Sequence, residues 1–254
     1  PLTQWIGARR ALAKLAFQQG HREAAVEQME AVIAEQSKLA ARSPNNVSSR
    51  GNLAIFHNDL ATFHLYGGRA KNAITEYEMA IEILRELIEE DPKNFSLKEQ
   101  LGNSLYGLSV AQSVAGSPNE ASKTLQECLE IRTTAKELDP TNLAREIRWL
   151  LTAARSGNLV HTVPLASKVK TRIAADAGMY FNLACVYAQL LAAAQRENTL
   201  PQNITATDLG QESLALLQKS YDLGFRRKTD LELDPDLAPI RGLSTDPAAT
   251  VEEQ

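Results

Sequence analysis

The chain repeats itself at an interval of 48 residues. Similar hexapeptides occur three times: "ARSPNN" ends at Asn46, "EEDPKN" ends at Asn94, and "ELDPTN" ends at Asn142. Each has a proline two residues before its last asparagine, so these prolines also lie 48 residues apart. A repeat of this length is typical of a small structural unit that cannot bury its apolar face alone, so neighbouring copies must stack on one another.

Other positions agree at the same spacing, and they divide each unit into two helices. Apolar residues recur at intervals of three and four, stop at a glycine, resume, and stop again before the proline. Glycine ends a helix because it adopts a positive φ at little cost, and the residue before a proline resists the helical region. The aligned sets are Gly20, Gly68 and Gly116; Ala25, Ala73 and Ala121; Leu12, Leu60 and Leu108; and Trp5, Leu53 and Leu101.

A short connection forces two successive helices to run antiparallel, so each unit is predicted to be a helical hairpin. The predicted turns lie at Gly20, Gly67–Gly68 and Gly116, and no strand is expected between residues 53 and 138. We expect Ala73 to be buried at the crossing of its two helices, where a small side chain lets the backbones approach.

The order of large and small residues resembles the tetratricopeptide (TPR) pattern. The usual TPR unit has about 34 residues, so each unit here is longer by about 14, roughly seven residues or two helical turns in each helix. HEAT-like units, with a period of about 40–47, are the alternative. The resemblance implies an all-α, right-handed α-solenoid of antiparallel helical hairpins. The matching residues are Leu60, Ala61, Gly68, Ala73, Tyr77, Ala80 and Pro92, and later Tyr180, Leu183, Ala184 and Tyr187.

Three regions follow from this register. Residues 1–142 are predicted to form three long hairpins, and residues 143–225 two degenerate hairpins with a loop insertion near 197–207. In the second region we expect Pro164 in the first turn of a helix, and a later helix that begins at Asp208 and ends at Gly224. Residues 226–254 are predicted to be a capping segment followed by a disordered tail. The residues expected to pack on the last helix are Leu231, Leu233, Leu237 and Ile240.

The C-terminal third resembles a narrower group. Between residues 179 and 242, the strings "YFNLACVYAQL", "ALLQKSYDLGFRR" and "LDPDLAPIRG" resemble the closing repeats of planctomycete-type bacterial serine/threonine protein kinases. In those proteins a kinase domain is followed, often after a membrane span, by a TPR-like region. The resemblance implies a C-terminal regulatory or sensor region, cytoplasmic in location, in a parent protein that can be membrane-anchored. The chain begins at Pro1, so we expect a piece of a longer protein.

Composition excludes several classes of function. The net charge of −4 argues against a nucleic-acid partner, because nucleic-acid-binding surfaces carry a basic excess. The longest largely apolar stretch, "LACVYAQLLAAA", has 12 residues, which suits a buried helix and predicts no membrane insertion. The two cysteines, Cys128 and Cys185, have apolar neighbours and are predicted to be buried free thiols in a reducing compartment.

No motif for catalysis, a cofactor or a metal is recognisable. The Gly-x-Gly-x-x-Gly loop, the catalytic-loop His-Arg-Asp, the Asp-Phe-Gly motif and the Walker loop are all missing from the sequence. His57 and His64 could share a helix face, but no Cys, Asp or Glu completes a metal-ligand spacing. We therefore expect no catalytic residue, no cofactor and no metal, and any kinase activity would belong to another part of the parent protein.

The first helices of stacked hairpins are expected to line a groove that holds a protein or peptide partner. Arg10, Asn58 and Tyr106 occupy equivalent positions one repeat apart and should form a row, with Lys14 and Thr62 beside it. A row of donors with one aromatic residue is typical of a binding surface and could hold a carboxylate. An ordinary solvated helix face is the alternative. The candidate groove residues are Arg10, Lys14, Asn58, Thr62, Asn103 and Tyr106.

The sequence thus predicts a non-catalytic protein–protein interaction scaffold. Two alternatives remain open. One is a homo-oligomerisation module, such as a homodimer, in which apolar end surfaces of the solenoid pair with another copy. The other is a stand-alone TPR adaptor.

Overall fold

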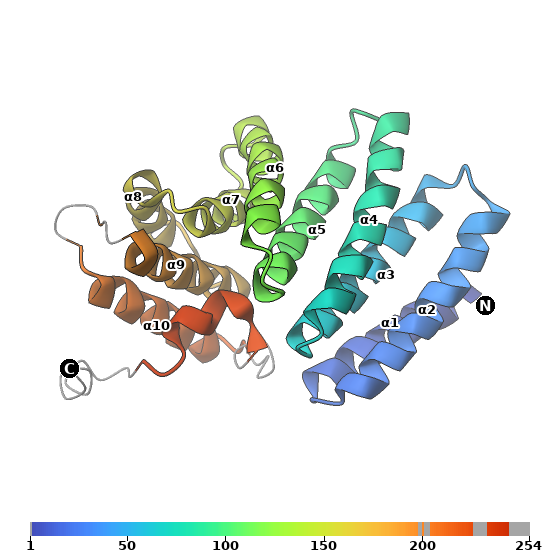
Figure 1. Cartoon of the computed structure of the whole chain (residues 1–254), viewed down its shortest axis with the longest axis horizontal. Coiled ribbons are helices and arrows are strands. Elements are labelled where there is room, and N and C mark those ends of the chain that lie inside the picture. The colour runs from blue at the N-terminus through green and yellow to red at the C-terminus, as the bar shows by residue number, and fades with distance from the viewer. Residues whose placement is uncertain (1, 198–199, 201–203, 226–232, 244–254) are drawn as a thin grey trace. The chain divides into compact units, whose positions relative to one another are not determined.

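The computed structural model describes residues 2–197, 200, 204–225 and 233–243. Within these residues all regular secondary structure is helical, which confirms the predicted all-α class (Figure 1). The helices are α1 (Leu2–Gln18), α2 (Arg22–Arg42), α3 (Val47–Tyr66), α4 (Ala70–Glu90), α5 (Phe95–Val114), α6 (Pro118–Leu138), α7 (Leu143–Arg155), α8 (Leu159–Lys170), α9 (Ala177–Glu197), α10 (Ala206–Asp222) and the 3-10 helix η1 (Pro235–Ile240).

The chain forms two compact units. In the described part, unit 1 extends to Ile131, and unit 2 begins at Arg132. The division falls inside α6, so the compact units do not coincide with the sequence repeat that ends at Asn142.

The predicted turns of the hairpins are confirmed. Gly20, Gly68 and Gly116 follow α1, α3 and α5, and their φ angles are +85°, +74° and +84°. An L-residue with a Cβ rarely adopts such angles, so glycine is the residue that allows the chain to reverse there. Each short turn sets the next helix antiparallel to the last, and Figure 1 shows α1 beside α2 and α3 beside α4.

The segments that end at Asn46, Asn94 and Asn142 connect one hairpin to the next, and their asparagines have a role that the sequence pattern did not reveal. Asn46, Asn94 and Asn142 are the N-cap residues of α3, α5 and α7. Their side-chain oxygens accept hydrogen bonds from the backbone amides of the third helical residue, at 2.9, 3.3 and 3.2 Å. Each asparagine therefore satisfies one backbone donor that the first turn of a helix would otherwise leave unpaired.

Unit 1 has a layered core in which each hairpin stacks on the next. One buried cluster joins α1 and α2 to α3, and Phe17 stacks on Phe63 with ring centroids 4.4 Å apart. A second cluster joins α3 to α4, α5 and α6, and in it Ala73 is fully buried, as expected. Because α3 contributes to both clusters, unit 1 is a stack of antiparallel hairpins, the arrangement predicted from the repeat.

Unit 2 contains α7 to α10 and η1, with α9 in contact with every other one of these elements. Two details differ from expectation. Pro164 lies inside α8, at its sixth residue, because Asn158 begins that helix earlier than predicted. The N-cap of α10 is Thr205 rather than Asp208, whose carboxylate instead accepts from the Thr205 amide in a capping box. Gly224 ends this helix with a φ of +94°, as predicted.

The capping segment is partly described. Leu237 and Ile240 are buried, Leu233 is half-buried, and η1 contacts both α9 and α10. Arg155 of α7 reaches the Asp236 carboxylate at 2.8 Å, and Gln189 donates to the Asp236 carbonyl at 2.9 Å. Residues 233–243 therefore cover part of α9. Leu231, the predicted tail, and residues 198–199 and 201–203 of the predicted 197–207 loop lie outside the described residues.

Helix α9 is long and apolar enough to cross a membrane by length and composition, although its continuous apolar run is short. Polar residues such as Asn182 and Gln189 interrupt that run, which is why the sequence pattern did not reveal its full length. In the structure 72% of its most apolar window is buried inside unit 2. A buried core helix gives the same composition, and the expectation of no membrane insertion remains a prediction.

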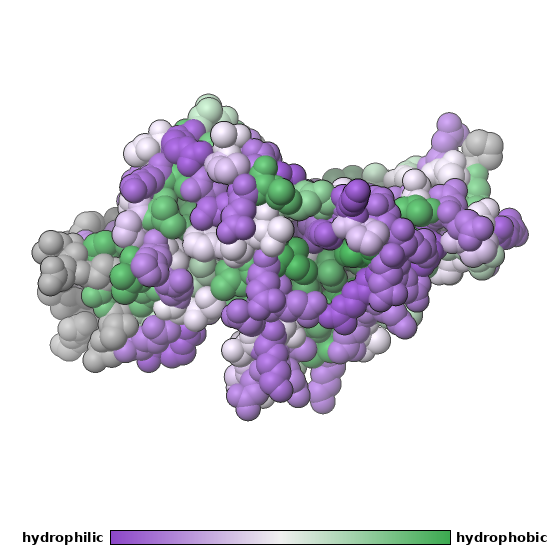
Figure 2. Space-filling model, turned by 90° about the horizontal axis from the view of Figure 1, so that it is seen from above, coloured by the Kyte–Doolittle hydropathy of each residue, from purple (hydrophilic) through white to green (hydrophobic). Residues whose placement is uncertain are grey.

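Both cysteines are buried free thiols, as predicted. The Cys128 thiol of α6 donates to the Gly102 carbonyl of α5 at 3.1 Å, which helps to join the two helices. The molecular face in Figure 2 is mainly hydrophilic, with smaller hydrophobic areas between charged side chains.

Candidate functional site

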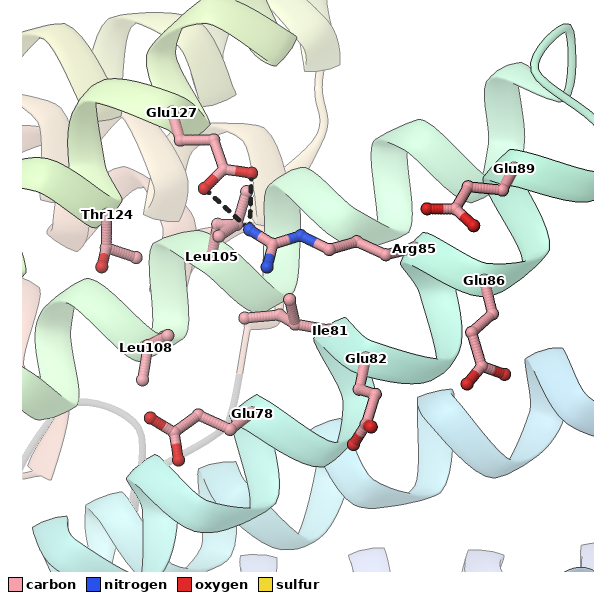
Figure 3. A pocket seen from close by; sticks show the side chains of 10 residues that line it. All are labelled: Glu78, Ile81, Glu82, Arg85, Glu86, Glu89, Leu105, Leu108, Thr124 and Glu127. Carbon is pink, nitrogen blue, oxygen red and sulfur yellow. Dashed lines mark hydrogen bonds and ion pairs between the residues drawn. The ribbon is translucent and has the colours of Figure 1, made fainter.

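A groove of about 480 Å³ lies between α4 and α6 in unit 1 (Figure 3). The two helices are the second helices of neighbouring hairpins, and α5 passes beneath them. The floor consists of Ile81, Leu105 and Leu108, which are buried members of the core. The remaining lining residues are Glu78, Glu82, Arg85, Glu86 and Glu89 from α4, and Thr124 and Glu127 from α6.

The walls of the groove are strongly acidic. Its lining contains five carboxylates and one guanidinium, a net charge of −4 that equals the net charge of the whole chain. On α4 the spacing of these glutamates follows the turns of the helix, so Glu78, Glu82 and Glu89 lie along one side of it. The groove therefore concentrates negative charge beside an apolar floor.

Two arginines neutralise part of this charge. Arg85 spans the groove, and its Nη2 donates to both carboxylate oxygens of Glu127, at 2.9 and 3.0 Å (Figure 3). Arg50 of α3 binds Glu86 and Glu90 on the other side of α4, and these hydrogen bonds, that of Glu90 first, raise the pKa of Arg50. Both Arg85 and Glu127 are about half exposed, so their bridge contributes only about 0.2–1 kcal/mol and can open for a competing ligand.

The other three carboxylates of the groove have no cationic partner among the described residues. Glu78, Glu82 and Glu89 form no ion pair there, and all three are exposed. Like charges four residues apart on a helix repel one another and destabilise it by about 0.2–0.5 kcal/mol a pair. A cationic ligand in the groove would remove this repulsion.

The sequence reasoning did not select this groove, although one signal for it was present. The stretch from Glu76 to Asp91, "EYEMAIEILRELIEED", contains glutamates spaced three and four apart with a single arginine. In the predicted hairpin these glutamates belong to the outer, solvated side of a second helix. The apolar floor could not be predicted, because it depends on how α5 lies beneath α4 and α6.

At the N-terminal end of the predicted row, the two cationic residues of α1 form ion pairs within the chain. The Arg10 Nε donates to Asp59 Oδ2 at 2.7 Å, and the Lys14 Nζ lies 3.1 Å from Asp59 Oδ1. The carboxylate that these cations were expected to take from a ligand is therefore supplied by α3. The repeat makes Arg10 equivalent to Asn58, so the alignment did not draw attention to Asp59, the acidic residue that follows Asn58.

The middle of the row is held by hydrogen bonds within one hairpin and to the next. Ser104 Oγ of α5 donates to Asn58 Oδ1 of α3 at 3.1 Å. Thr62 donates to the Asn58 carbonyl at 3.0 Å and lies 3.2 Å from the Tyr77 hydroxyl. These contacts join α3 to α4 and α5.

Asn58 and Asn103 come together in a second, smaller pocket of about 140 Å³. Asn103 is the one exposed residue of the six candidates, and Tyr106 is half-buried against the core. Most of the row is thus more buried than expected, because its polar side chains bind the neighbouring helix. The other residues that line this pocket are Ala54, Ile55, Leu84, Gln100 and Ser104.

The two histidines of α3, His57 and His64, are buried in the packing of unit 1. The His57 Nδ1 lies 2.7 Å from Glu76 Oε2 of α4, in a half-buried pair. His64 is buried, and its Nδ1 has no hydrogen-bond partner in the described structure. Burial, followed by the positive charge of Arg69, lowers the pKa of His64 below 6.5. Across the described residues, no three His, Cys, Asp or Glu side chains are grouped so that they could hold a metal ion.

Comparison with known proteins identifies no family. No protein-family model matches the chain, and no curated protein matches it. Among solved structures, the chain is similar to the nearly identical TPR-like repeats assigned to a kinesin light chain of Podosopora anserina, with 21% identity and a TM-score of 0.46 over 86% of this chain and 94% of that one. A singly substituted form of those repeats gives 19% identity and a TM-score of 0.47, over 90% and 96%.

Both TM-scores are below 0.5, so the assignment of the fold depends on the helices and contacts of the chain itself.

Proposed function

We propose that this chain is a non-catalytic scaffold for protein–protein interaction, and that the groove between α4 and α6 binds a basic segment of its partner. One observation carries the proposal: an apolar floor lies beside three carboxylates that have no cationic partner in the described residues.

The two parts of the groove would contribute differently to binding. Leu105 and Leu108 are almost fully buried, so the apolar area covered on binding is mainly that of the partner's own side chain, which supplies affinity at about 25 cal/mol per Å². The carboxylates attract a cationic segment from a distance and fix which segment binds. A segment with arginine or lysine beside a leucine-like residue meets both requirements.

The size of the groove limits the ligand to a short motif. A volume of about 480 Å³ holds a few side chains rather than a folded domain. An amphipathic helix that presents its apolar face to a groove is a common form of such recognition. We therefore favour a basic amphipathic helix, with its cations near Glu78 and Glu82.

The experiment uses a fluorescein-labelled peptide with arginines along one helical face and leucines beside them. Its binding to the chain would be followed by fluorescence anisotropy. Glu78→Gln combined with Glu82→Gln should weaken binding at least about tenfold, or 1.4 kcal/mol. Glu23→Gln combined with Glu27→Gln is the matched control, because these glutamates are also exposed, four residues apart, and lie on α2.

Salt provides a second readout. Binding to the unmodified chain should weaken as ionic strength rises, because exposed charges are screened over about 10 Å at 0.1 M salt. The Glu78→Gln, Glu82→Gln variant should show a smaller salt dependence. Equal affinity of both variants and the unmodified chain for the peptide would refute the role of the groove.

We also propose what kind of parent protein contains this chain. The resemblance of residues 179–242 to planctomycete-type kinases supports a regulatory region of a bacterial serine/threonine protein kinase, with a cytoplasmic location. The coding sequence upstream of Pro1 tests this directly. A kinase catalytic domain encoded there would support it, and an unrelated domain would contradict it.

The first-helix row is a second candidate surface, because Asn58 and Asn103 line a pocket of their own. Arg10→Glu combined with Tyr106→Ala should weaken binding at least about tenfold if the partner uses this row. The Arg10 change also breaks the ion pair with Asp59, so the melting temperature of the variant must be measured beside its affinity.

A further inference from the structure

Helix α1 exposes a continuous apolar stripe. Leu12 is 59% exposed, Leu15 is 48% exposed and Trp5 is 39% exposed, and Ala8 is exposed between them. The spacing of these residues, three and four apart, places them on one face of the helix. Single exposed apolar residues are ordinary, whereas an aligned set along one helix needs an explanation.

The opposite face of α1 is already buried. Ile6, Ala13 and Phe17 belong to the core cluster that joins α1 to α2 and α3. The helix therefore has two apolar faces, of which only one is covered.

In the next repeat, the residues of α3 that are equivalent to the exposed stripe of α1 are buried. The positions 48 residues after Ala8, Leu12 and Leu15 are Phe56, Leu60 and Phe63 of α3. There the exposures are 5%, 3% and 4%. These residues are covered by the preceding hairpin, α1 and α2.

The third repeat agrees. The equivalent residues of α5 are Ser104, Leu108 and Ala111, which are 2%, 6% and 0% exposed. The last two belong to the cluster formed with α3 and α4, again the preceding hairpin. In both α3 and α5, the helix face equivalent to the exposed stripe of α1 is therefore covered by the preceding hairpin.

We infer that the exposed stripe of α1, formed by Trp5, Ala8, Leu12 and Leu15, is a docking surface for an antiparallel helical hairpin of the same class as those in this chain. The chemistry of the occupant follows from the α3 interface. Such a hairpin presents aromatic and aliphatic side chains equivalent to Phe17 and Met29, which cover α3.

The occupant is a hairpin other than those of a second intact copy. In this chain the α1–α2 surface is already covered by α3, and the α3–α4 surface by α5. A second copy would have to unstack its own core to offer either surface, and its own exposed stripe on α1 offers a single helix face rather than a hairpin. The docking of a free hairpin requires no such loss.

The test supplies a hairpin of this class within the full chain. Residues 1–48 are duplicated in front of Pro1, so that the added hairpin precedes α1 by one repeat length. The backbone amides of the original α1 should then exchange with deuterium at least about tenfold more slowly, since stability gained on docking reduces local opening. The melting temperature should rise by about 4 °C or more.

The matched control carries Leu12→Glu and Leu15→Glu in the original α1 of the duplicated chain. Both side chains are exposed, so the same substitutions in the unduplicated chain should leave its melting temperature nearly unchanged. In the duplicated chain they should abolish the gain in protection. Equal exchange of α1 with and without the added hairpin would overturn the inference. A dimer of the unmodified chain that these substitutions dissociate, seen by light scattering, would also overturn it.

Discussion

Two glycines in equivalent helices should respond in opposite ways to a single methyl group. Gly51 lies in α3 and Gly107 in α5, both first helices of a hairpin. A Cβ added at Gly51 meets no atom within 4 Å, whereas one at Gly107 would lie 2.3 Å from Cζ and 2.6 Å from the hydroxyl of Tyr77. Tyr77 is buried, and its hydroxyl lies 3.2 Å from Thr62.

The expected free energies have opposite signs. Replacing a glycine within a helix by alanine stabilises it by about 0.5–1 kcal/mol, so Gly51→Ala should stabilise unit 1 by that amount. At Gly107 the same gain is opposed by overpacking, which costs about 1–3 kcal/mol, and by loss of the Tyr77–Thr62 contact, about 1 kcal/mol. The net result for Gly107→Ala is a destabilisation of about 1–3 kcal/mol.

Thermal unfolding followed by circular dichroism measures both changes. We expect the melting temperature to rise by roughly 1–4 °C for Gly51→Ala and to fall by roughly 2–12 °C for Gly107→Ala. Tyr77→Leu combined with Gly107→Ala should be less destabilised than the two single changes predict together, because the smaller side chain leaves room for the methyl group. If Gly107→Ala stabilises the chain as Gly51→Ala does, then Tyr77 does not lie against α5, and the packing of α4 on α5 is wrong.

Three further predictions concern the same unit. Ala73→Leu should lower the free energy of unfolding by about 1–3 kcal/mol, because Ala73 is fully buried at the helix crossing; an unchanged thermal melt would show that the register is wrong. Asn94→Ala should cost about 1 kcal/mol in urea unfolding through loss of the α5 cap, and Asn94→Asp should retain most of it. The pKa of His64 is lower in the folded chain than 6.5, so the unfolded chain binds the proton more readily and stability should fall as pH drops below about 6.5. His64→Gln should flatten that part of the stability–pH curve, and an equally steep curve in the variant would contradict the assignment.

The sequence predicted the helices well because their determinants are local. Glycines that need a positive φ, such as Gly20 and Gly116, mark the turns, and the spacing of apolar residues marks the faces that stack. The small residue at Ala73 was likewise predictable, since a helix crossing leaves no room for a larger one.

The candidate site was much harder to predict, because it depends on contacts between repeats. Asp59 neutralises Arg10 from the next hairpin, one position away from the residue that the repeat aligns with it. The groove between α4 and α6 arises only when Leu105 of α5 forms a floor beneath the glutamates of α4. After Asn142, which still marks the start of α7, the repeat decays, so Pro164 was expected in the first turn of a helix that in fact begins five residues earlier.

Mapping where the peptide contacts the chain decides the claim that a basic partner segment binds the groove between α4 and α6. The arginine–leucine peptide would carry a benzophenone in place of one leucine, and photo-crosslinked residues would be identified by mass spectrometry. We predict crosslinks to the groove floor and walls, around Ile81, Leu105 and Thr124, which are lost when Glu78 and Glu82 are replaced by glutamine. Crosslinks confined to the pocket of Asn58 and Asn103, or to unit 2, would contradict the claim.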